Sequence, residues 1–93
     1  MLSKLPTNID KLGKHERDNE ILRAAIIAEL DAVSLYEQLA AMTEDKNLKI
    51  VLLDIAKEEK VHVGEFQALL LKKDKEQAQA LITGQAETEE LTK

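Results

Sequence analysis

Apolar residues recur every three or four positions along two long stretches of the chain, residues 14–42 and 44–73. This spacing places the apolar side chains on one face of a helix, so each stretch is predicted to be an amphipathic helix. Residues 43–47 interrupt the pattern and offer Thr43 or Asp45 as the N-cap of the second helix. Because the connection is short, we predict that the two helices form an antiparallel hairpin.

The two ends of the chain depart from this pattern. Residues 1–13 show no sustained period and are predicted to be a leader. A capping box that begins at Asp74 predicts a short third helix over residues 75–83, which Gly84 is expected to end. Residues 84–93 are polar and are predicted to be a tail. The sequence therefore predicts one all-α domain.

Ionisable residues interrupt both apolar stripes at matching heights. Glu29 interrupts the stripe of the first helix, and Glu59 and His62 interrupt that of the second. Counted outward from the connection, Glu29 and Glu59 lie nearly level, and His62 lies about one turn further away. A carboxylate in apolar surroundings is costly unless something neutralises it. The second stripe is formed by Leu48, Leu52, Ile55, Glu59, His62, Phe66 and Leu69.

A Glu-x-x-His pair matched by a further Glu is half of the ligand set of di-iron carboxylate bundles. This chain has one such pair, one further Glu and no internal repeat, so a two-fold dimer forming a four-helix bundle would complete the site. The four carboxylates of two chains would balance two divalent ions. The simpler alternative is that Glu59 and His62 form a structural polar pair that fixes helix register.

Composition narrows the chemistry. The chain has no Cys, so any metal would be held by oxygen and nitrogen ligands, which suit iron, manganese or zinc. A formal net charge of −5 with one Tyr and one Phe argues against a nucleic-acid partner. No apolar run approaches the length that spans a membrane, and the first residues lack the apolar core of a signal peptide. We therefore predict a soluble protein without a membrane partner.

Three further residues lie close to the expected site in the sequence. Tyr36 follows Glu29 by two turns on the same face, so its hydroxyl could reach the site, or it could be an ordinary core tyrosine. Asp31 and Glu58 lie off the ligand stripe. They could form an outer carboxylate pair that attracts cations, or they could be plain solvated charges.

The residues 29–36, with the sequence Glu-Leu-Asp-Ala-Val-Ser-Leu-Tyr, together with residues 58–62, Glu-Glu-Lys-Val-His, resemble the encapsulated ferritins of the ferritin-like superfamily. The resemblance implies two-helix chains that pair into a di-iron four-helix unit and assemble into a decameric ring of five dimers. It implies iron ligands at Glu29, Glu59 and His62 and a tyrosine, Tyr36, near the centre. Asp31 matches one acid of the family's outer carboxylate site. Ala28 stands where the family often has a second Glu, and no shell-docking segment is recognisable in residues 84–93.

On this resemblance we expect a ferroxidase that oxidises Fe(II) to Fe(III) with O2, with two iron ions at each dimer interface. The expected role is iron storage or detoxification inside an encapsulin shell, in the cytoplasm. Calcium, zinc or manganese is expected to occupy the site in vitro as well. The alternative is a non-catalytic metal-binding module or a metal-stabilised assembly module, and a third hypothesis is plain structural dimerisation through the apolar stripes.

Overall fold

The computed structural model describes residues 13–93 as three helices. Helix α1 is Lys14–Met42, α2 is Lys46–Lys73 and α3 is Lys75–Leu91. No strand occurs in these residues, so the predicted all-α class is confirmed. The predicted leader lies outside the described residues except for Gly13, which is the N-cap of α1.

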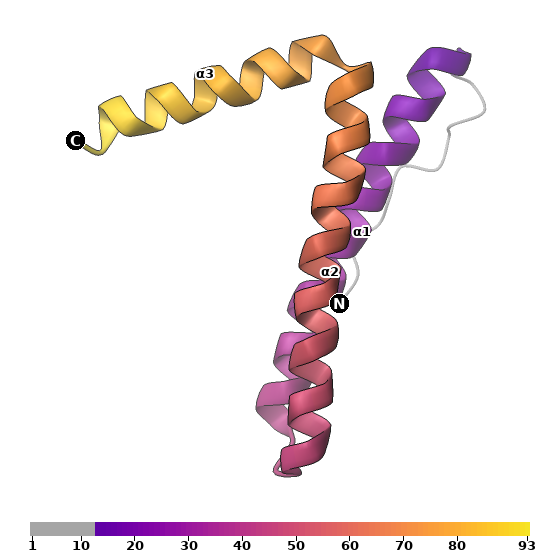
Figure 1. Ribbon diagram of the computed structural model, residues 1–93, viewed down its shortest axis with the longest axis vertical. Helices are drawn as coiled ribbons and strands as arrows, with labels where there is room; N and C mark the ends of the chain where they lie inside the picture. The colour runs from indigo at the N-terminus through magenta and orange to yellow at the C-terminus, as the bar shows by residue number, and fades with distance from the viewer. Residues whose placement is uncertain (1–12) are drawn as a thin grey trace.

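Helices α1 and α2 lie side by side and run antiparallel, joined at one end by the short connection (Figure 1). They pack through the apolar positions that the periodicity placed on one face, and the contact is thin. Within the described part of the chain only five apolar side chains are buried: Leu22, Val33, Ala40, Ala56 and Leu70. Two helices can cover only one stripe of each other, so much apolar surface stays exposed.

Helix α2 begins at Lys46, two residues later than the predicted start at 44. Asp45 has an extended backbone, and its Oδ1 accepts a hydrogen bond of 2.9 Å from the backbone N–H of Leu48. The backbone N–H of Asp45 in turn donates to Oγ1 of Thr43 at 3.1 Å. Asp45 is therefore the N-cap, because its carboxylate satisfies a backbone donor of the first turn, and Thr43 supports it.

Helix α3 continues to Leu91, so the prediction of a helix over 75–83 followed by a tail was wrong. Gly84 does not end the helix, since no glycine in the described part of the chain adopts a positive φ. A glycine inside a helix costs about 1 kcal/mol relative to alanine. That cost is too small to stop a helix whose next residues, Gln85, Ala86 and Glu87, favour helix.

Helix α3 leaves the hairpin at Asp74 and projects to one side as an arm (Figure 1). The radius of gyration is 16.5 Å, against about 12 Å for a compact chain of this length. The arm's apolar side chains are not covered by the rest of the chain: Leu81 is 43%, Ile82 64% and Leu91 84% exposed.

The Asp45 cap gives a test of the hairpin's stability. Replacing Asp45 by Ala removes the acceptor for the Leu48 N–H and should lower the free energy of unfolding by ~1 kcal/mol. Asp45→Asn keeps an acceptor at this position and should lose much less. Urea denaturation followed by circular dichroism, at one chain concentration, measures both. Equal stability of Asp45→Ala and the unmodified protein would contradict this assignment of the cap.

Candidate metal centre

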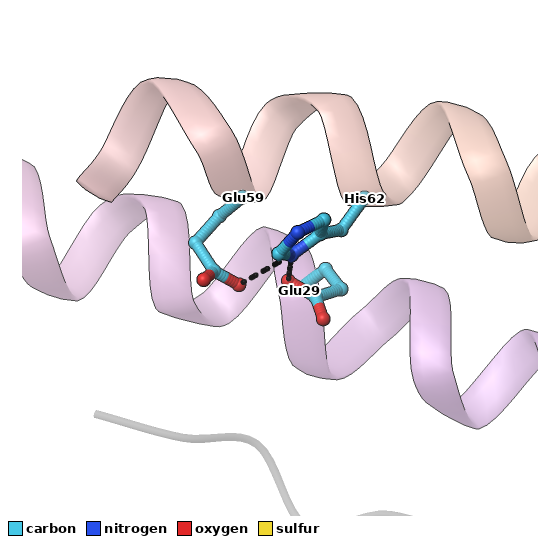
Figure 2. A group of neighbouring side chains, drawn as sticks. All are labelled: Glu29, Glu59 and His62. Atoms are coloured by element: carbon cyan, nitrogen blue, oxygen red, sulfur yellow. Dashed lines mark ion pairs between the residues drawn. The ribbon is translucent and has the colours of Figure 1, made fainter. Parts of the chain in front are cut away.

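Three side chains converge on one side of the hairpin: Glu29 from α1, and Glu59 and His62 from α2 (Figure 2). The Nδ1 atom of His62 lies 3.5 Å from Oε2 of Glu29 and 3.6 Å from Oε2 of Glu59. One ligand atom from each residue lies within 4.8 Å of the others. A single chain therefore brings the three side chains together at one point.

These separations are longer than hydrogen bonds and close to the spacing of ligands on one metal ion. An N–H···O hydrogen bond spans about 2.7–3.2 Å. Oxygen and nitrogen ligands each lie about 2.0–2.2 Å from an ion, which puts neighbouring ligand atoms about 3.0–3.4 Å apart. The observed 3.5 and 3.6 Å are only slightly wider, so small side-chain movements would close the three ligands onto an ion.

The burial of Glu29 also favours a metal ion at this centre. Its Oε2 atom is buried and has no hydrogen-bond partner, and its side chain is 20% exposed. The side chain of Glu59 is 19% exposed. A buried polar atom without a partner costs about 1–3 kcal/mol, and more when the group is charged. A cation held between the two carboxylates would remove that cost, and this set of oxygen and nitrogen donors suits iron, manganese or zinc.

The helical register explains why these residues meet. Glu59 and His62 are three residues apart and so share a face of α2. Ala56, one turn before Glu59, is only 2% exposed, and its small side chain lets α1 come close at this level. On α1, the buried Val33 lies one turn after Glu29 and anchors the same contact. Apolar packing on either side thus sets the height at which the ligands face one another.

The centre is open on the side away from the hairpin contact. The side chain of His62 is 42% exposed. Leu48 and Leu69, at the two ends of the stripe that carries Glu59 and His62, are 49% and 50% exposed. The ligands therefore lie in an apolar face that one chain leaves uncovered, and three side chains leave further coordination positions of an ion open.

Of the other predicted residues, Asp31 and Glu58 do not join the converging group. Asp31 is half-buried and has an interaction of its own, and Glu58 is exposed. Tyr36 is half-buried two turns after Glu29, and side chains on a helix lean toward its N-terminus, which is toward Glu29. The roles of these three residues stay predictions. No further His, Asp or Glu whose side chain the structure describes joins the group.

The three ligands can be tested by metal binding alone. Glu59→Gln keeps the shape of the side chain and removes its charge. Loss of groups that merely support ligands weakens metal affinity 10–100-fold, so loss of a ligand should weaken it by about 100-fold or more. Asp54→Asn, an exposed carboxylate on the same helix, is the matched control and should bind normally. Anaerobic calorimetry with Fe(II) or Mn(II) measures both, and equal affinities would argue against the centre.

Comparison with known proteins gives consistent matches. Residues 4–87 match the family model described as EncFtn-like. The chain is 57% identical over 94 residues to a ferritin-like–encapsulin shell fusion protein of Pyrococcus furiosus, a match that covers 99% of this chain and 27% of that protein. The chain thus spans about a quarter of the length of this curated relative.

A solved structure gives a similar result. The crystal structure of the encapsulated ferritin domain from Pyrococcus furiosus is similar with a TM-score of 0.84 and 55% sequence identity. The similarity covers 99% of this chain and 96% of that one. Separately, none of the helices in residues 13–93 combines the length and the apolar character that crossing a bilayer requires.

Proposed function

This chain belongs to the EncFtn-like family, and on that premise we propose that it is a ferroxidase, which oxidises Fe(II) with O2 at a di-iron centre shared by two copies of the chain. The observation that carries the proposal is the convergence of Glu29, Glu59 and His62, with a buried oxygen on Glu29 that has no hydrogen-bond partner, in an apolar stripe whose ends are half-exposed. The supporting context is a family whose members include a domain described as an encapsulated ferritin.

The surface of the chain supports pairing. Its accessible surface is 7206 Å², whereas a compact monomer of 10.4 kDa exposes about 5,400 Å². A stable protein–protein interface buries about 1,600 Å² in total, or about 800 Å² on each partner. The excess of about 1,800 Å² on one chain is therefore more than one partner of such an interface contributes. A two-fold axis beside His62 would bring two half-sites together and form a four-helix bundle.

Charge balance supports two ions in the paired site. Each chain contributes two carboxylates, from Glu29 and Glu59, and one neutral imidazole from His62. Two chains thus place four negative charges around two Fe(II) ions, which carry four positive charges. After oxidation the ions carry six, so the product is no longer neutralised by the site. This imbalance favours uptake of hydroxide or departure of Fe(III).

In the proposed reaction iron is the substrate. Two Fe(II) ions give one electron each to O2, which takes up two protons and becomes hydrogen peroxide. The carboxylates of Glu29 and Glu59 hold the ions and stabilise the rising charge, and Nδ1 of His62 fixes the geometry. Tyr36 would lie near the centre, and Asp31 with Glu58 would attract cations from outside.

The oxidised iron would be stored outside this chain. The hairpin of the described residues is two helices thick and has no room for a mineral particle. The name of the Pyrococcus furiosus relative joins a ferritin-like part to an encapsulin shell. We therefore propose storage inside an encapsulin shell in the cytoplasm, with the chain arranged as a ring of five dimers.

Oxygen consumption tests the reaction. Glu29→Ala removes one carboxylate from each half-site and should slow O2 uptake after Fe(II) addition by about 100-fold or more, to the rate without protein. Glu44→Ala, an exposed carboxylate at the helix connection, should leave the rate unchanged. Stoichiometric Fe(II) binding with no O2 uptake by the unmodified protein would instead favour a non-catalytic assembly module, for which zinc serves as well as iron.

Native mass spectrometry tests the shared site. The unmodified protein should carry two metal ions per pair of chains. Leu69→Lys places a charge on the apolar face of α2 in both copies and removes about 1.5 kcal/mol of burial from each, so pairing should weaken by about 100-fold or more. Ile50→Lys, on the opposite side of α2, should leave the pair and its metal intact. Metal binding by isolated single chains at full affinity would count against a shared centre.

A further inference from the structure

A single residue, Asp74, joins the arm α3 to the hairpin. It caps both helices: its backbone N–H donates to the carbonyl of Leu70 at 2.8 Å, and its carbonyl accepts from the N–H of Ala78 at 3.1 Å. Asp74 is the single residue between the end of α2 at Lys73 and the start of α3 at Lys75, and its φ of −116° and ψ of 90° are not helical. Since the peptide bonds are planar, the direction of the arm depends on these two dihedral angles.

The carboxylate of Asp74 links three helices. Its Oδ1 accepts a hydrogen bond of 3.0 Å from the N–H of Gln77, in the first turn of α3. Its Oδ2 lies 2.7 Å from Nη2 of Arg23, which comes from α1, 51 residues away in the sequence. A second contact orients the guanidinium, because Nη1 of Arg23 lies 3.3 Å from Oε2 of Glu20. The Asp74 side chain is only 13% exposed.

Apolar packing does not fix the arm as firmly. The corner below the ion pair contains a groove of about 300 Å³, lined by apolar residues of all three helices, among them Ile26, Leu70 and Leu81. Beyond this corner every residue of α3 from Leu81 onward is exposed. Side chains that face each other across this groove lose dispersion contacts, so packing at the corner contributes little to holding the arm in place.

We propose that the Arg23–Asp74 ion pair is a latch that fixes the direction of α3 relative to the hairpin. The two residues lie outside the converging group of Glu29, Glu59 and His62, so the latch is independent of metal chemistry. The hydrogen bond from the Gln77 N–H and the neighbouring Arg23 lower the pKa of Asp74, so its carboxylate is charged at neutral pH. The latch thereby determines where the arm's uncovered apolar side chains are presented.

Pulsed electron paramagnetic resonance can measure the arm's direction directly. The chain has no Cys, so Lys57→Cys on α2 and Glu87→Cys on α3 place two spin labels at exposed positions. Mixing labelled chains with an excess of unlabelled chains isolates the distance within one chain. We expect one narrow distance maximum for the latched protein, and a broader distribution in Arg23→Gln and in Asp74→Asn.

The variants separate the latch from simple loss of structure. Asn caps helices as well as Asp does, so Asp74→Asn removes the ion pair but keeps the start of α3, which circular dichroism checks. Amide exchange in the first turns of α3 should rise only two- to fivefold in Arg23→Gln, as for loss of a surface ion pair. Lys73→Gln is the matched control, since Lys73 pairs with Asp18 of α1 at 3.7 Å, an ion pair between the two helices of the hairpin.

Two results decide the outcome. Lys73→Gln should keep the narrow maximum, and metal binding should be unchanged in all of these variants. Narrow, unshifted distributions in both Arg23→Gln and Asp74→Asn would overturn the latch, because the backbone of Asp74 or contacts with other copies would then suffice to hold the arm.

Discussion

A carboxylate oxygen that is buried without a hydrogen-bond partner has to be neutralised, and this constraint governs the hairpin. Oε2 of Glu29 is buried without a hydrogen-bond partner, and the nearest imidazole nitrogen, 3.5 Å away on His62, is too distant to bond it. Glu59 adds a second carboxylate at the same level. A positive charge placed between them is the simplest physical solution, and small side-chain movements would bring the three ligand atoms onto one ion.

Two helices are also too few to bury the apolar surface of the hairpin. Only five apolar residues are buried in the described part of the chain, and the ends of the stripe that carries the ligands are half-exposed. In the proposed pair, metal binding and chain pairing would support each other. A second copy would supply ligands and exclude water, which would strengthen the attraction between ion and carboxylates, and the ion would offset the repulsion among the four carboxylates.

The spacing of apolar and charged residues predicted most of the features that depend on residues close together in the sequence. The bounds of α1 follow from its apolar period, and counting from the connection placed Glu29 and Glu59 nearly level, with His62 about one turn further away. The length of α3 was missed because Gly84 was interpreted as a stop, although glycine ends a helix only where the backbone needs a positive φ. The Arg23–Asp74 pair was missed because two charges 51 residues apart leave no pattern in the sequence.

The apolar face around the metal centre and the exposed apolar side chains of α3 would form different kinds of contact between chains. This difference determines how large an assembly can form. A two-fold interface around the metal centre is self-complementary, so it closes after two chains. A ring of dimers requires a second contact, made through a different surface of each chain. The arm provides a surface of that type, because α3 projects from the end of α2 and its apolar side chains are exposed (Figure 1). If Asp74 and Arg23 fix the arm's direction, they also fix the rotation between successive dimers, and that rotation determines whether a ring closes or a filament continues.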